Sequence, residues 1–247
     1  MAQDDASLSV IQLLLRDFAA MTHSAPNVLE RFLHYVQFDT QSDETSAAAP
    51  STAKQLKLAE ALKDELHQLG IANAVIGQGG VVYAQIPASR GCEDLPAVGF
   101  IAHMDTSPDA SGLHVKPQII RFDGTDVLLN QTEGIRFPVK RFPEIKKYIG
   151  EDVIFTDGTT LLGADDKSGI AAIMDMAAKI TADPKIAHAK LCIAFTPDEE
   201  IGRGTANFDL ERFGADWAVT IDGGEVGTLE NENFNAGSAV VDFQGVG

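Results

Sequence analysis

The stretch KSGIAAIMDMAAKITADPKIAHAKLCIAFT, residues 167–196, places a predicted helix directly before a predicted strand. KSGIAAIMDMAAKI, residues 167–180, favours a helix. KLCIAFT, residues 190–196, contains the apolar run LCIAF and is typical of a strand buried on both faces. Strands and helices go on alternating on both sides of this stretch. Because such alternation forms β-α-β units, we expect an α/β fold with a mostly parallel mixed sheet flanked by helices.

Two amphipathic helices are predicted nearer the N-terminus. Residues 27–38, NVLERFLHYVQF, can begin at the N-cap Asn27, and residues 51–70 can begin at Ser51 and end at Gly70. The residues expected on their buried faces are Val28, Leu29, Phe32, Tyr35 and Val36 in the first helix and Leu58, Leu62, Leu66 and Leu69 in the second.

The other segments complete this pattern. Strands are predicted at residues 80–86, 97–103, 152–156 and 217–222, and a short helix at 209–214. Residues 107–150 are rich in Pro, Gly and charge and show no clear period, so we expect loops and short strands there. The sequence shows no internal repeat and no interdomain linker.

The composition argues against several classes of protein. The 247 residues carry a formal net charge of −17. This charge argues against a nucleic-acid partner, which needs excess Lys and Arg, and suits a cationic ligand or a metal ion. The two cysteines, Cys92 and Cys192, do not indicate a disulfide scaffold, so we expect a cytoplasmic protein. We expect no membrane partner, because no signal peptide and no apolar run of roughly 18 residues is found.

Imidazole and carboxylate side chains follow the predicted strands. His103 ends one strand and Asp105 comes two residues later; in extended backbone the two point to the same side, so Asp105 could orient a metal-bound imidazole. The other acidic residues are Asp165 and Asp166 before a helix, Glu199 and Glu200 after a strand, and Asp222 at the end of a strand. Because open α/β sheets bind ligands beyond the carboxyl ends of their strands, we expect these clusters to share one site.

Each cluster taken alone has a simpler explanation. A His at a strand end is usually a polar loop residue, and an Asp pair before a helix is usually a cap. Adjacent glutamates are usually solvated, and Asp-Gly-Gly is usually a turn. Together, however, these carboxylates would repel one another in one cleft unless divalent cations compensated their charge. Mixed carboxylate and imidazole ligands suit zinc, with cobalt or manganese as substitutes.

Five ordered motifs resemble those of the M20 family of di-zinc metallopeptidases, and within it those of the tripeptide aminopeptidases. They are HMDTSP (103–108), DGTTLLGADDKSG (157–169), TPDEEIGRG (196–204), IDGG (221–224) and ENENFNA (230–236). The resemblance covers roughly residues 27–247, and it implies a catalytic domain of the zinc-exopeptidase type.

The resemblance implies which residues hold the metals. Asp165 would bridge two zinc ions, His103 and Asp222 would complete the protein ligands of one, and Glu200 would bind the other. It also implies a cis peptide bond between Asp165 and Asp166.

The resemblance further implies a mechanism and a substrate. Glu199 would be the general base acting on the water between the metals, and Asp105 would hold His103 in one tautomer. The implied activity is hydrolysis that releases the N-terminal residue from tripeptides. The alternatives are another activity of the family, such as a dipeptidase, carboxypeptidase or N-acyl amino acid deacylase, or a metal-binding protein without catalysis.

The sequence departs from the family pattern at its C-terminal end. Members of the family take a further histidine for the second zinc and carry an inserted lid domain used for dimerisation. We expect residues 1–26 to be an N-terminal extension, 27–233 a catalytic domain lacking its C-terminal part, and 234–247 the first strand of the lid. The chain would then be an N-terminal fragment, with an incomplete site, of a homodimeric parent. The histidines that match no family motif are His23, His34, His67, His114 and His188.

Overall fold

The computed structural model describes residues 26–224, 227–231, 237, 239 and 241–245. The expected N-terminal extension therefore lies outside the described residues, apart from residue 26. The described residues of the segment 234–247 form no strand, and none of them pairs with the sheets. The domain boundaries expected from the sequence stay predictions.

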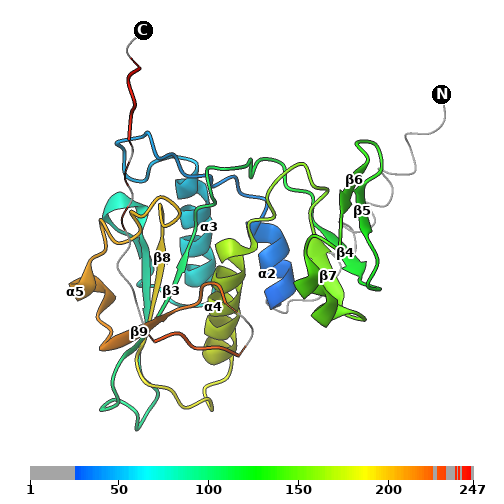
Figure 1. Cartoon of the computed structure of the whole chain (residues 1–247). Coiled ribbons are helices and arrows are strands. Elements are labelled where there is room, and N and C mark those ends of the chain that lie inside the picture. The colour runs from blue at the N-terminus through cyan, green and yellow to red at the C-terminus, as the bar shows by residue number, and fades with distance from the viewer. Residues whose placement is uncertain (1–25, 225–226, 232–236, 238, 240, 246–247) are drawn as a thin grey trace, which may run out of the picture.

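The centre of the described structure is a five-stranded sheet in the order β1–β2–β8–β3–β9 (Figure 1). The strands are β1 (Val75–Ile76), β2 (Val82–Ile86), β3 (Val98–His103), β8 (Leu191–Thr196) and β9 (Trp217–Thr220). β8 and β9 lie parallel to β3 on either side of it, whereas β2 is antiparallel to both β8 and β1. Because only β2 runs against the other strands, the expected mostly parallel mixed sheet is confirmed.

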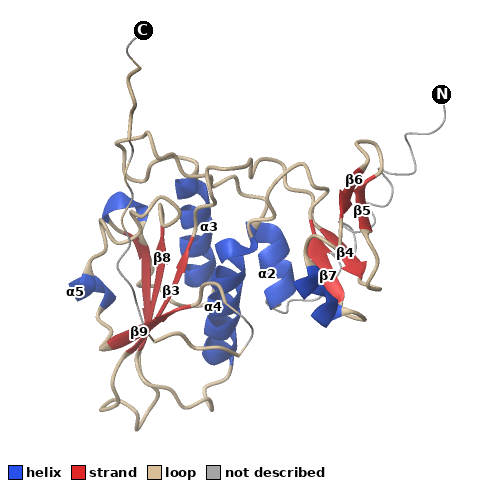
Figure 2. Ribbon diagram, in the orientation of Figure 1, coloured by secondary structure: helices blue, strands red, loops and turns tan. Residues whose placement is uncertain are grey.

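Helices cover both faces of this sheet. The helices are α2 (Val28–Tyr35), α3 (Gln55–Gln68), α4 (Ala164–Ala182) and α5 (Leu210–Phe213). α3 and α4 pack on one face, with α2 against α4, and α5 packs on the other face (Figure 2). All six residues of β8 are buried, because Ile193 and Phe195 face the larger core while Cys192 and Ala194 face the smaller core under α5. The predicted two-sided burial of this strand is confirmed.

The first two helices differ in part from the prediction. Asn27 caps α2 with a capping box to Glu30, as expected, but Val28 and Leu29 are exposed rather than buried. α3 begins at Gln55 and not near Ser51. The reason is a tertiary contact, because the Ser51 hydroxyl and backbone N–H both donate hydrogen bonds to a distant carboxylate, that of Asp198.

Residues 118–155 form a smaller β-rich unit beside α2 (Figure 2). Its elements are the antiparallel pair β4 (Gln118–Arg121) and β7 (Asp152–Phe155), the antiparallel pair β5 (Val127–Asn130) and β6 (Ile135–Phe137), and the 3₁₀ helix η2 (Pro143–Tyr148). Another 3₁₀ helix, η1 (Gln78–Gly80), lies outside this unit and precedes β2. Its core consists of Phe122, Val139, Ile145 and Phe155. The loops and short strands expected here are confirmed. No helix in the described part of the chain is long and apolar enough to cross a bilayer.

Candidate metal and active site

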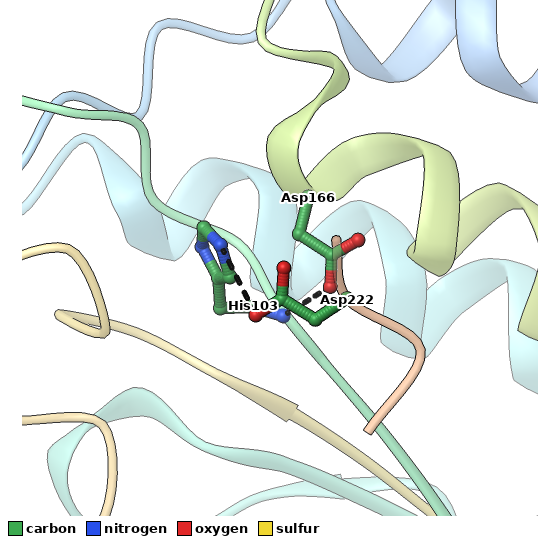
Figure 3. Close-up of side chains that lie close together, drawn as sticks. All are labelled: His103, Asp166 and Asp222. Atoms are coloured by element: carbon green, nitrogen blue, oxygen red, sulfur yellow. Dashed lines mark hydrogen bonds and ion pairs between the residues drawn. The ribbon is translucent and has the colours of Figure 1, made fainter. Parts of the chain in front are cut away.

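The side chains singled out from the sequence meet at one edge of the sheet. His103 is the last residue of β3, Glu199 and Glu200 follow β8, and Asp222 follows β9. Because β3, β8 and β9 are parallel, their carboxyl ends lie together, and the start of α4 brings its Asp pair to the same place. Figure 3 shows the side chains of His103, Asp166 and Asp222 close together at this edge.

His103 is at the centre of this cluster and is 2% exposed. Its Nε2 lies 2.8 Å from a carboxylate oxygen of Asp165, 3.8 Å from Glu199 and 3.9 Å from Asp222. Its Nδ1 faces Asp105, 3.0 Å from the backbone carbonyl and 3.4 Å from the carboxylate. Burial alone would lower the pKa of His103, but the hydrogen bonds and charges of Asp105 and the other carboxylates raise that pKa to about 10. Because Nδ1 faces Asp105, Nε2 is the ring nitrogen that faces the other carboxylates of the cluster.

Asp105 also joins two strands, which the sequence does not predict. Its buried carboxylate accepts the backbone N–H of Glu199 at 2.9 Å and that of Glu200 at 3.1 Å. The residue that faces Nδ1 of His103 thus also fixes the backbone of the two glutamates that follow β8.

Asp166, which the sequence places at this site without a separate role, has a comparable position. Its carboxylate accepts the backbone N–H groups of His103 and Gly169, each at 3.1 Å. A Cβ on Gly169 would lie 2.0 Å from the carbonyl oxygen of Ile221 and 2.3 Å from Oδ1 of Asp166, so only glycine fits between α4 and the end of β9. The peptide bond between Asp165 and Asp166 is cis, as the resemblance implies.

The carboxylates crowd one another. Burial raises the pKa of Glu199, Glu200 and Asp222, and neighbouring carboxylates raise it further against the opposing charge of His103. Burial likewise raises the pKa of Asp166 to about 8, although His103 opposes this shift. The cluster by itself therefore favours bound protons, and a divalent cation among these oxygens would favour their ionised forms instead.

Two groups of side chains have ligand atoms within 4.8 Å of one another: His103, Asp165 and Glu200, and His103, Asp166 and Asp222. An imidazole nitrogen with several carboxylate oxygens is a donor set that zinc, manganese and cobalt accept, so these residues fit a divalent cation. Both groups need His103, whose only ring nitrogen facing the cluster is Nε2. One imidazole nitrogen serves one ion, so a second ion would have to be held without His103.

The other histidines that the structure describes lie outside both groups. His67 Nε2 lies 2.8 Å from the carbonyl oxygen of Ala74, and His188 Nδ1 lies 2.9 Å from that of Ala189. His34 contacts an aromatic ring of its own helix. His114 belongs to neither group. Of the ENENFNA motif, only Glu230 and Asn231 lie among the described residues, and His23 lies outside them.

Comparison with known proteins agrees with this geometry. No family model matches the chain. It is 56% identical over 220 residues to peptidase T of Desulfitobacterium hafniense (strain Y51), 54% over 219 residues to that of Clostridium acetobutylicum, and 53% over 220 residues to that of Aliivibrio salmonicida. The chain is homologous to peptidase T. The alignments cover 88 to 89% of this chain and 53% of each peptidase T, so the chain spans about half the length of these relatives.

Solved structures show the same fold. Aminopeptidase PepT from Bacillus cereus ATCC 10987 matches with a TM-score of 0.56 and 23% identity, over 80% of this chain and 43% of that one. A tripeptidase from Staphylococcus aureus matches with a TM-score of 0.56 and 24% identity, over 81% and 43%. Together with the peptidase T homologues, these matches confirm the resemblance to M20 peptidases.

Proposed function

We propose that the protein carrying this chain is a metal-dependent exopeptidase that releases the N-terminal residue from tripeptides. The observation that carries this proposal is the convergence of His103 with the carboxylates of three other segments at one sheet edge, in a chain homologous to peptidase T. The proposed metal ligands are His103, Asp165, Glu200 and Asp222, and zinc is the proposed metal.

The residues of the chain divide the chemistry between them. Zinc held by these residues would supply Lewis acidity, which would lower the pKa of water and polarise the scissile carbonyl. Glu199 accepts the proton of the attacking water and delivers it to the nitrogen of the leaving amine. Its side chain is 50% exposed and 3.8 Å from Nε2 of His103, so it reaches both the cluster and the solvent side where a peptide enters. Asp105 keeps Nδ1 of His103 occupied, which leaves Nε2 for the metal.

The remainder of the enzyme belongs to the same proposal. The chain spans about half of its relatives, so we propose that a further histidine for the second zinc, the contacts that select the substrate and the dimer interface lie in the rest of the protein. A cytoplasmic location is likewise proposed.

The test uses the full-length protein that carries this chain. After removal of metal with a chelator and reloading with zinc, it is assayed against tripeptides, dipeptides and N-acyl amino acids. We expect activity only in the zinc-loaded protein, with the free N-terminal residue and a dipeptide as products. A preference for N-acyl amino acids or dipeptides would assign another activity of the family, and metal binding without hydrolysis would refute the enzymatic function.

A further inference from the structure

Asp198 is a buried carboxylate outside the proposed ligand set. It lies between β8 and Glu199, is 4% exposed and has a left-handed backbone with φ of +61°. Its carboxylate accepts the backbone N–H of Ser51 at 2.7 Å, the hydroxyl of Ser51 at 2.5 Å and the side-chain amide of Gln55 at 2.6 Å. Its own N–H donates to the side-chain oxygen of Gln55 at 3.2 Å. Asp198 is therefore bonded to the start of α3 through both its backbone and its side chain.

Hydrogen bonds offset the desolvation cost of burying this carboxylate. Within the described residues, no Lys or Arg pairs with Asp198, so neutral donors alone stabilise its buried charge. The positive φ of Asp198 lies in the left-handed region, which Asn and Asp adopt more readily than most L-residues. Asp198 therefore joins the turn after β8 to the start of α3 through bonds that only a side chain with two acceptor oxygens can make together.

The consequence of these bonds lies at the next residue. Asp198 fixes the backbone on one side of Glu199, and Asp105 fixes it on the other side by accepting the N–H groups of Glu199 and Glu200. The turn is closed by Arg203, whose N–H donates to the carbonyl of Asp198 at 2.8 Å. The backbone of Glu199 is thus clamped between β3 and α3, while its carboxylate stays half exposed.

We propose that Asp198 is a positioning residue, which with Ser51 and Gln55 aims the Glu199 carboxylate at the reacting water. Asp198 touches no reacting atom and acts through the turn it holds. This inference rests on the proposed function, in which Glu199 moves the proton. A shift of about 1 Å at a catalytic group can cost on the order of 100-fold in rate, so even a small relaxation of the turn would be measurable.

The test is Asp198→Asn in the full-length protein, because asparagine keeps the shape but turns an NH₂ group toward donors. We expect kcat on a tripeptide to fall at least about 10-fold, with KM and bound zinc within about twofold of wild type. The double variant D198N/Q55E reverses donor and acceptor, because the carboxylate introduced at position 55 can accept the amide introduced at position 198. This double variant should recover most of kcat.

Asp216→Asn, at an exposed carboxylate that also accepts a backbone N–H, is the control. The Asp216 carboxylate accepts the N–H of Ala97 at 2.7 Å near the amino end of β9, at the opposite end of the sheet from the site. This variant should lower stability and leave kcat unchanged. If D198N does not fold, Ser51→Ala removes one of the three bonds to the carboxylate, and it should lower kcat a fewfold at unchanged KM.

The outcomes separate the two proposals. An active wild-type enzyme whose D198N variant keeps full kcat would overturn the positioning role and leave the peptidase function standing. The positioning role would also be overturned if the fall in kcat of D198N merely matched its loss of folded or zinc-loaded protein and the double variant did not recover kcat. A zinc-loaded wild type that hydrolyses no peptide would overturn the proposed function and, with it, this inference.

Discussion

Gly169→Ala should destabilise the protein, although alanine is the better helix former. Gly169 lies inside α4, where alanine would ordinarily stabilise by about 1 kcal/mol. The added Cβ, however, would lie 2.0 Å from the carbonyl oxygen of Ile221 and 2.3 Å from Oδ1 of Asp166. Both contacts are far inside van der Waals distance, and the first is with backbone, which cannot rotate away. Overpacking typically costs about 1–3 kcal/mol, and this site lies at the upper end, so we expect a net loss of about 1–2 kcal/mol.

The same substitution should also weaken metal binding. Ile221 directly precedes Asp222, and Asp166 holds the backbone N–H of His103, so relief of the clash moves two parts of the site. Urea denaturation of the metal-free full-length protein measures the first effect, and competition with a zinc-chelating dye measures the second, for which we expect at least a 10-fold loss. Ala172→Gly, at an exposed position one turn later in α4, is the control and should cost about 1 kcal/mol without changing zinc affinity. A Gly169→Ala protein that is more stable than wild type and binds zinc equally well would refute this reasoning.

Three further predictions follow from the site. Asp105→Asn leaves the backbone N–H of Glu199 or of Glu200 facing an NH₂ group, so it should lower the free energy of unfolding by about 2–3 kcal/mol in a denaturant titration. An unchanged denaturation midpoint would show that these two bonds are not needed for stability. Glu199→Gln should lower kcat by about 10²–10⁴-fold and keep bound zinc, and retained turnover would exclude Glu199 as the base. Residues 1–247 alone should hold one zinc ion more tightly than a second, because only one imidazole among the described residues faces the cluster. Elemental analysis that finds two tightly held zinc ions per chain would contradict this prediction.

The parts predicted from sequence are those that depend on local pattern. Within KLCIAFT, the five residues LCIAF are all apolar because β8 is covered on both faces, so its burial could be predicted without the structure. Parallel strands then bring their carboxyl ends together, which is why His103, Glu199 and Asp222 could be assigned to one edge. Asp165, from the start of a helix, reaches the same place, in accordance with the family resemblance.

The parts that could not be predicted are contacts between segments far apart in the chain. Ser51 has the sequence context of an N-cap, but it serves a carboxylate 147 residues away, so the helix begins later. The two amides that Asp105 accepts lie 94 and 95 residues from it. Val28 and Leu29 are expected on the buried face of α2, but both are exposed, because burial depends on which distant segments cover the helix. Local pattern does not carry the information that fixes these choices.

These distant contacts have a shared role. The proposed metal ligands lie on segments that end in loops, and loops alone place side chains loosely. Two carboxylates that are not proposed ligands, Asp105 and Asp166, use their oxygens on backbone N–H groups of the ligand-bearing segments. Such bonds fix the main chain and leave the ligand side chains free to close on an ion. The acidic residues at this edge therefore include the proposed metal ligands and, in Asp105 and Asp166, carboxylates whose oxygens hold the backbone.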